Sequence, residues 1–188
     1  MEDKVLLDVQ GLKTYFHTFK GVVKAVDNVS FSLKEGEILG IVGESGSGKS
    51  VTSFSILKLV EDPGVVDADH IMFDGKDLAK ISEKDMSKIR GKDISMVFQD
   101  PMTSLNPIIT IGKQITSVIM KHQDCTENEA RLRALDLMDK VGIPNPEARF
   151  DDYPFQYSGG MRQRIVIAIA LSCQPKILIC DEPTTALD

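Results

Sequence analysis

Apolar and polar positions near the start of the chain follow the pattern of strands. Residues 5–16 and 22–33 are rich in β-branched, aromatic and other apolar residues, which strands favour. Residues 34–36 turn the chain into residues 38–42, a nearly all-apolar run that ends at Gly43. A short run of this kind predicts a central parallel strand buried on both faces.

A helix is expected after the glycine-rich turn that follows this strand. The helix covers residues 49–60 and stops at residues 61–64, which read Glu-Asp-Pro-Gly. Strand, glycine-rich turn and helix form the opening of a βαβ unit. Residues 71–73, followed by Asp74 and Gly75, predict a hairpin.

The middle of the chain predicts a short helix and a second buried strand. Ser82, with Asp85 three residues later, begins the helix, and Gly91 ends it. The strand covers residues 94–98 and ends at Gln99.

Residues 100–172 are interpreted as a mostly helical lobe. Thr126 and Glu129 form a capping box, and the helix that they begin closes at Gly142. Its apolar stripe at helical spacing consists of Ala130, Ala134, Leu137 and Val141.

The last helix of this lobe is expected from Ser158 to about residue 172. Its apolar run, residues 165–171, is also compatible with a strand. Helix is preferred because Ser158 is a good N-cap and because residues 173–175 separate the run from a better strand, residues 177–180.

Composition narrows the class of protein. The chain has 188 residues, of which 42% are apolar, and 22 Lys+Arg against 28 Asp+Glu give a net charge of −6. This excludes a disordered or fibrous protein and disfavours nucleic acid as a partner, because nonspecific binding to nucleic acid needs many cationic contacts. No apolar run approaches the roughly 20 residues of a membrane-spanning helix. The three cysteines have no CxxC spacing and are expected to be reduced thiols.

Residues 43–50 read GESGSGKS and fit the pattern G-x-x-x-x-G-K-S/T. Glycines let successive backbone N–H groups turn inward around phosphate oxygens, and the helix that follows directs its positive end at the same anion. Lys49 supplies a charge to the β- and γ-phosphates, and the Ser50 hydroxyl is placed to bind Mg²⁺.

Two carboxylates follow the strand that residues 177–180 predict. The tip of a parallel strand is where such folds bind ligands. Asp181 is expected to hold Mg²⁺ through water, and Glu182 to accept a proton from the water that attacks the γ-phosphate. An acidic turn after a strand is common, so this pattern gains weight only from the phosphate loop upstream.

Ser158, Gly159 and Gly160 open the run SGGMRQR. Two glycines after an N-cap serine leave the first N–H groups of a helix uncovered, which makes an anion site. Taken alone, the same residues are equally compatible with a helix start that needs close packing.

With these motifs in order, the whole chain resembles the nucleotide-binding subunits of ATP-binding cassette (ABC) transporters. GESGSGKS is similar to the Walker A motif, YSGGMRQR to the ABC signature and ILICDE to the Walker B motif. Gln99 matches the Q-loop glutamine, and residues 185–188 match the D-loop. Phe16 lies where the family stacks adenine, with Tyr15 as the competing choice.

The resemblance implies an α/β fold: a P-loop NTPase core, an N-terminal antiparallel β subdomain and an inserted α-helical subdomain. The implied parts are a β-rich and P-loop core (residues 1–99), a helical subdomain with the signature (residues 100–172) and the Walker B strand with the D-loop (residues 173–188). The implied nucleotide contacts are Phe16, Gly43, Glu44, Ser45, Gly46, Ser47, Gly48, Lys49, Ser50, Val51, Ser158, Gly159, Gly160 and Asp188. The implied catalytic residues are Glu182 and Gln99, and the implied Mg²⁺ ligands are Ser50, Gln99 and Asp181.

The segments FQDPMTSLNPIITIG, SGGMRQR and DEPTTALD look most like those of the D-type ATPase of oligopeptide, dipeptide and nickel importers. Two residues depart from that pattern: Tyr157 replaces the usual leucine before SGG, and Phe155 stands where histidine is common. Both lie outside the glycine contacts, so they bear on the substrate assignment more than on ATP binding.

The resemblance also implies partners. Two ATPase subunits, sisters or copies, sandwich two ATP molecules, and the helix start at Ser158 closes over the nucleotide that its partner holds. Gln99 senses Mg²⁺ and the attacking water, and the helical lobe grips a transmembrane permease, which a solute-binding protein serves. The implied location is peripheral, at the cytoplasmic face of the membrane.

Two alternatives stay open. The first is an ABC ATPase that serves DNA repair or translation, which the importer-like wording after Gln99 disfavours. The second is a nucleotide-binding fragment that does not turn over, because the sequence ends at the D-loop and holds neither the family's switch histidine nor a strand to flank residues 177–180.

Overall fold

The computed structural model describes residues 4–183. The chain divides into two compact units, Met1–Ser87 and Lys88–Asp188. Each unit is described by itself.

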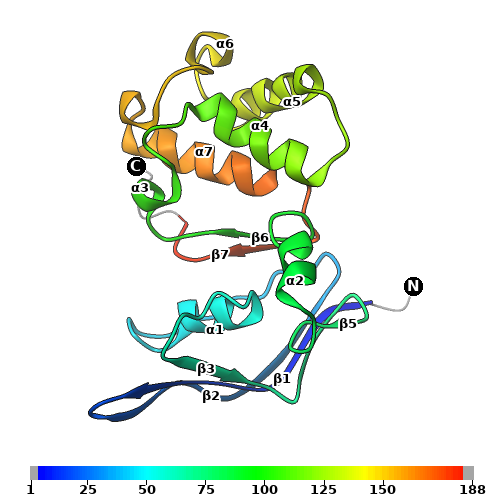
Figure 1. Ribbon diagram of the computed structural model, residues 1–188, viewed down its shortest axis with the longest axis vertical. Coiled ribbons are helices and arrows are strands. Elements are labelled where there is room, and N and C mark those ends of the chain that lie inside the picture. The colour runs from blue at the N-terminus through cyan, green and yellow to red at the C-terminus, as the bar shows by residue number, and fades with distance from the viewer. Residues whose placement is uncertain (1–3, 184–188) are drawn as a thin grey trace. The chain divides into compact units, whose positions relative to one another are not determined.

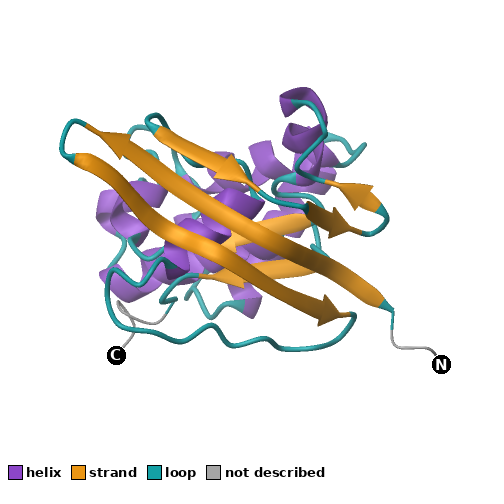
Figure 2. Cartoon of the chain, turned by 90° about the horizontal axis from the view of Figure 1, so that it is seen from below, coloured by secondary structure: helices purple, strands orange, loops and turns teal. Residues whose placement is uncertain are grey.

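The first unit is built on an antiparallel sheet, which Figure 1 shows from one side and Figure 2 from below. Its two long strands are β1 (Val5–Thr18) and β2 (Gly21–Lys34), which pair along almost their whole length. The other edge of β1 pairs with β3 (Gly64–Asp67) and with β4 (His70–Phe73), and β4 pairs with β5 (Lys76–Asp77). Both long strands predicted from the sequence are confirmed.

The predicted hairpin is also confirmed. Asp74 and Gly75 connect β4 to β5, and both have positive φ angles, 44° and 82°. Two positive φ angles in a two-residue loop suit the right-handed twist of the strands it joins.

Helix α1 (Lys49–Ile56) lies against β1 and β2 in the first unit (Figure 1). A buried pair of hydroxyl groups, Thr14 Oγ1 and Ser55 Oγ at 2.7 Å, joins the helix to β1. The helix ends at Ile56 and not near residue 60 as predicted, because Lys58 has a φ of 51°, which leaves the helical region. The expected extent was therefore too long.

The prediction of a buried strand at residues 38–42 is wrong for this structure. The segment has no regular secondary structure, and Ile38 and Val42 are 96% and 92% exposed. A strand needs a neighbour that takes its backbone N–H and C=O groups. In the described part of the first unit no strand pairs with this segment, so its apolar composition alone does not make it one.

Helix α2 (Glu83–Ile89) crosses the boundary between the two units. The Asp85 N–H donates to Ser82 Oγ at 3.1 Å, and the Ser82 hydroxyl donates to the Asp85 carboxylate at 2.8 Å. Gly91 follows the helix with a φ of 79°. The predicted start and end of this helix are confirmed.

The second unit packs helices on a pair of parallel strands, β6 (Ile94–Val97) and β7 (Ile177–Cys180). Figure 1 shows α4, α5 and α7 together as one layer beside these strands. Its helical elements are α3 (Pro101–Ser104), α4 (Ile111–His122), α5 (Glu127–Lys140), α6 (Pro146–Arg149), the 3₁₀ turn η1 (Pro154–Gln156) and α7 (Gly159–Leu171).

The choice of a helix for residues 165–171 is confirmed, because they form most of α7. Its inner positions are buried among side chains from α4 and α5, so the apolar run packs as a core helix. The buried members of the cluster include Ile115, Ile119, Ala130, Ala134, Met138, Ile165, Val166 and Ala170. The capping box of α5 is also confirmed, with Thr126 Oγ1 and Glu129 as its members.

The boundary between the two compact units falls between Ser87 and Lys88, before the subdomain boundary expected at residue 99. The boundary comes earlier because β6 pairs with β7 and not with the sheet of the first unit. The finer division into core and helical subdomain stays a prediction. None of the helices in residues 4–183 is long and apolar enough to cross a membrane. The cysteines at positions 125, 173 and 180 are free thiols, as expected.

Candidate functional site: a phosphate loop and a paired carboxylate turn

The glycine-rich loop of the first unit ends in a conformation that only glycine adopts easily. Gly48, the N-cap of α1, has a φ of 92°, and a Cβ there would lie 2.1 Å from the Ala25 carbonyl oxygen. Gly46 also has a positive φ, 79°. No side chain caps α1 and its first turn holds no acidic residue, so the positive end of the helix is open to an anion.

Lys49 folds back over this loop. Its Nζ donates to the carbonyl oxygens of Gly43 and Glu44, at 2.9 and 2.8 Å. The amine thus ties the helix start to the first two loop residues and places a positive charge beside the loop. Ser50 and Val51 complete the first turn of the helix.

The remaining predicted contacts of this loop are Ser45 and Ser47, which are exposed like Gly43 and Glu44. The Ser47 N–H donates to the Glu44 carbonyl oxygen at 3.1 Å, which closes the turn. The loop is therefore a solvent-facing turn that leads directly into α1.

Phe16 and Tyr15 lie on opposite faces of β1, because side chains alternate along a strand. Phe16 shares its face with Thr14, the residue bound to α1, and its ring packs beside Gly64 of β3. Tyr15 faces the other way: its hydroxyl donates to the Asp27 carboxylate and the Lys24 amine lies 5.1 Å from its ring centre. The aromatic on the helix side of the strand is Phe16.

In the second unit, the parallel register of β6 and β7 brings two predicted residues together. Val97 is level with Cys180, so Gln99 and Glu182 both stand two residues beyond the same rung. Gln99 Nε2 donates to Glu182 Oε2 at 2.6 Å. The amide side chain and the carboxylate are thus a bonded pair.

The turn after β7 is held from several sides. The Asp181 N–H donates to the Val97 carbonyl oxygen at 3.0 Å, which extends the ladder by one residue. Glu182 adopts a φ of 46°, a left-handed conformation that a non-glycine residue holds only when its surroundings require it.

Sequence reasoning missed one residue at this turn, Gln163 of α7. Its Nε2 donates to the Pro183 carbonyl oxygen at 2.6 Å, and the side chain is fully buried. Nothing in the sequence singles it out, because Gln163 stands between Arg162 and Arg164 at the start of the helix.

Helix α7 begins as predicted. The Met161 N–H donates to Ser158 Oγ at 3.3 Å, so Ser158 is its N-cap, and Gly159 and Gly160 form the first turn. A Cβ on Gly159 would meet nothing within 4 Å. Packing among residues 4–183 therefore does not require a glycine at that position.

The two residues that depart from the family's sequence pattern, Tyr157 and Phe155, have different surroundings. Tyr157 is 3% exposed and its hydroxyl donates to the Arg149 carbonyl oxygen at 2.7 Å, and burial raises its pKa to about 12. Phe155 is 73% exposed and stacks on Tyr153, with ring centres 5.8 Å apart. Tyr157 is thus a core residue and Phe155 a surface residue.

Each unit therefore gathers its own part of the predicted site. The first holds the loop with the first turn of α1 and Phe16, and the second holds Gln99, Asp181 and Glu182 with the start of α7. Asp188 and the D-loop lie outside the described residues.

The residues of both parts fit Mg²⁺ and a phosphate chain. A hydroxyl at Ser50, a carboxylate at Asp181 and an amide oxygen at Gln99 are oxygen donors, which Mg²⁺ prefers. The open start of α1, with the Lys49 amine beside it, suits a polyanion.

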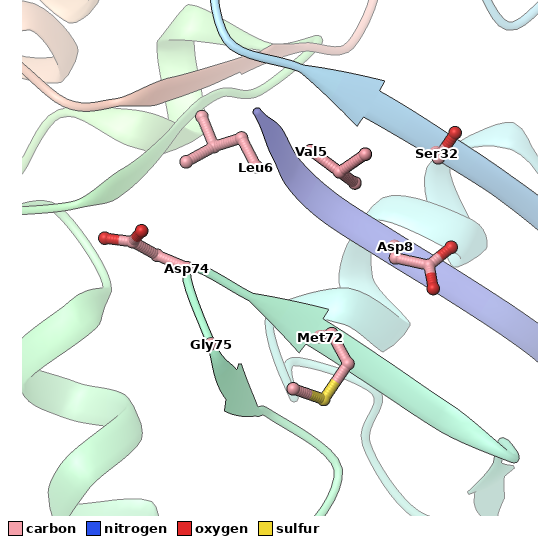
Figure 3. Close-up of a pocket in the computed structure, with 7 residues that line it drawn as sticks. All are labelled: Val5, Leu6, Asp8, Ser32, Met72, Asp74 and Gly75. Carbon is pink, nitrogen blue, oxygen red and sulfur yellow. The ribbon is translucent and has the colours of Figure 1, made fainter. Parts of the chain in front are cut away.

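A separate pocket lies on the first unit's sheet (Figure 3). Its lining consists of Val5, Leu6, Asp8, Ser32, Met72, Asp74 and Gly75. Both carboxylates are already paired: His70 Nε2 lies 2.7 Å from Asp8, and Lys4 Nζ lies 2.5 Å from Asp74. The pocket contains none of the predicted nucleotide contacts.

The sequence is similar to those of known proteins. The chain is 52% identical over 183 residues to the dipeptide transport ATP-binding protein DppD of Escherichia coli (strain K12), covering 97% of this chain and 56% of the relative. It is 55% identical to the oligopeptide transport ATP-binding protein OppD of Bacillus subtilis (strain 168), covering 97% of this chain and 51% of the relative. The chain thus spans about half the length of the curated relatives it matches.

A solved structure and a family model indicate the same family as these relatives. The dimeric post-hydrolysis state of the ATP-binding cassette MJ0796, bound to ADP and Pi, matches with a TM-score of 0.85 at 28% identity, covering 97% of this chain and 76% of that one. The fold is thus that of the ABC ATPases, as the motifs predicted. The model described as ABC transporter matches residues 26–185, and the chain therefore belongs to the ABC transporter family.

Proposed function

We propose that this chain is the ATP-binding part of an importer ATPase, which binds Mg-ATP and hydrolyses it to drive uptake of peptides. The observation that carries the proposal is the start of α1: a left-handed Gly48, no side-chain cap, and the Lys49 amine bound across the loop. These features together support a site for a chain of phosphates. The peptide assignment rests on the names of the relatives DppD and OppD.

The predicted site residues of the first unit bind the nucleotide. The N–H groups of the loop and of the first turn of α1 receive the phosphate oxygens, and Lys49 exchanges a carbonyl partner for the β- and γ-phosphates. Phe16 stacks on adenine, which its place on the helix side of β1 favours over Tyr15. Ser50, with Asp181 of the second unit, would hold Mg²⁺, whose charge would offset that of the phosphates.

The second unit supplies the chemistry of proton transfer. Glu182 accepts the proton of the attacking water. Gln99 donates a hydrogen bond to Glu182 at 2.6 Å and so fixes the direction of the carboxylate.

Ser158, Gly159 and Gly160 contact the nucleotide held by a second ATPase subunit. The open space beside Gly159 supports this role, because an approaching ligand needs that space and the described residues leave it empty.

The proposed partners are a second ATPase subunit, transmembrane permease subunits and, through them, a solute-binding protein. The ATPase is peripheral, at the cytoplasmic face of the membrane. Hydrolysis ends the contact that each γ-phosphate makes across the subunit pair, so ATP and ADP favour different arrangements of the pair.

Binding is tested by titrating the chain with ATP and Mg²⁺ in a calorimeter. Lys49→Met is expected to weaken binding by about 10–100-fold, the loss of charge-assisted hydrogen bonds to phosphate. Lys20→Met removes an exposed lysine in the turn between β1 and β2 and serves as the matched control. Equal affinity of Lys49→Met and the wild type would contradict the proposed loop function.

Hydrolysis is tested by phosphate release from the same protein. Glu182→Gln is expected to keep ATP binding and to lower turnover by about 100-fold or more, which is typical of the loss of a general base. Binding without phosphate release in the wild type would favour the alternative, a nucleotide-binding module that does not turn over.

A further inference from the structure

Gln163 lies in the second turn of α7 and is 0% exposed. One end of its side-chain amide is satisfied, because Nε2 donates to the Pro183 carbonyl oxygen at 2.6 Å. The other end is not: within residues 4–183, Oε1 is buried without a hydrogen-bond partner. Among the described residues, the side chain therefore makes one hydrogen bond, to the residue directly after Glu182.

Stability does not explain a glutamine here. A buried acceptor without a partner costs folding free energy, and an apolar side chain of the same shape avoids that cost. Pro183 is only partly buried. An apolar residue such as methionine would therefore serve the fold at least as well.

The bond from Gln163 acts on a turn that needs support. Glu182 has a φ of 46°, which a non-glycine side chain disfavours. Gln99 from the end of β6 holds its carboxylate, and the Asp181 N–H is bonded to Val97 of the same strand. The bond from Gln163 of α7 to Pro183 holds the residue that follows Glu182 in the turn.

We propose that Gln163 is a positioning residue for ATP hydrolysis: its bond to Pro183 keeps the Glu182 turn in the left-handed conformation that directs the carboxylate. The inference rests on the proposed function of Glu182 as the general base. It also connects the start of α7 to the carboxylate, because Gln163 follows Ser158 by little more than one helical turn. A ligand bound at Ser158 and Gly159 is then one short helical segment away from the Glu182 turn.

The test is Gln163→Met, which keeps the length and apolar volume of the side chain and removes the amide. In the ATP-hydrolysing protein, kcat is expected to fall at least about tenfold, because a small misplacement of a catalytic group has a large effect on rate. The KM for ATP should stay within about twofold, since in the proposal Gln163 acts on the Glu182 turn and not on a residue that binds phosphate. The melting temperature should be unchanged or higher.

Gln174→Met is the matched control. It makes the same substitution at an exposed glutamine just after α7, and kcat, KM and melting temperature should all match the wild type. A fall in kcat of equal size in this control would overturn the proposal, because the effect would then not depend on the Pro183 bond.

A second measurement does not depend on turnover. Amide hydrogen exchange of Asp181 and Glu182 in the nucleotide-free chain should be at least about fivefold faster in Gln163→Met, because the turn opens more often. A wild-type protein that binds ATP without releasing phosphate would overturn the hydrolytic role of Glu182, and exchange alone would then decide whether Gln163 holds the turn.

Two results would show that Gln163 has only a structural role. One is unchanged kcat with unchanged exchange at residues 181 and 182. The other is a Gln163→Met protein that melts at a much lower temperature or does not fold. Either result overturns the proposal.

Discussion

Helices α1 and α7 both begin at a glycine-rich turn, yet the two turns are built differently. At α1 the N-cap is Gly48, with a φ of 92° and no room for a Cβ beside the Ala25 carbonyl oxygen. At α7 the N-cap is Ser158, which accepts a hydrogen bond from the Met161 N–H, and Gly159 after it has open space where a Cβ would lie.

The difference shows two distinct reasons for a glycine. The chain's own backbone requires Gly48, so this residue is needed for the loop to exist at all. Gly159 is not required by anything in the described chain, and in the proposed function its missing side chain makes room for the nucleotide that a second subunit holds. The first glycine therefore shapes its own loop, and the second leaves space beside the start of α7.

The largest expected effect separates these two glycines. Gly48→Ala should lower the free energy of unfolding by at least about 2 kcal/mol, because an alanine there has both a disfavoured φ and a backbone clash. Gly159→Ala should change it by less than about 0.5 kcal/mol. Urea denaturation of both variants measures the difference, and equal losses would mean that the two turns are not built differently.

A smaller effect is expected at the serine that caps α7. Ser158→Ala should cost about 1 kcal/mol of stability, because the Met161 N–H loses its acceptor. Ser45→Ala, in the exposed loop before α1, should cost less than about 0.5 kcal/mol, since α1 has no side-chain cap to lose. If Ser45→Ala costs as much as Ser158→Ala, then α1 depends on a serine that the structure does not show as its cap.

Sequence patterns predicted those parts of the molecule that short-range chemistry decides. Three such parts are the Ser158 cap, the Thr126–Glu129 box and the Asp74–Gly75 turn. Each depends on residues within three or four positions of one another, so the local sequence is enough to locate it. The same holds for the phosphate loop, in which one short stretch contains the glycines, the lysine and the helix start.

Long-range pairing decided the rest. Residues 38–42 have the composition of a buried strand, but a strand also needs a neighbour, and no local pattern reveals whether one is present. Gln99 and Glu182 were expected at the site from separate motifs, and only the parallel register of β6 and β7 shows that they are bonded. Gln163 was missed because its partner, Pro183, lies in a different element.

The smallest effect extends the comparison to α5, whose start has a complete capping box. The Thr126 N–H and hydroxyl both donate to the Glu129 carboxylate, and these bonds lower its pKa below the usual 4.5. A carboxyl group with a lowered pKa in the folded state adds stability above its unfolded pKa, and this stability is lost as the pH falls through the folded value.

Glu129→Ala should therefore be less stable than the wild type at pH 7, and the difference should shrink and vanish as the pH falls below 4.5. Urea midpoints of the two proteins across this range measure it. The first turns of α1 and α7 hold no acidic residue, so Ser158→Ala should lack this dependence and lose the same stability at both ends of the range. A parallel acid dependence in Ser158→Ala would mean that a carboxylate supports α7 after all, and that only α1 begins without a charged or hydroxyl cap.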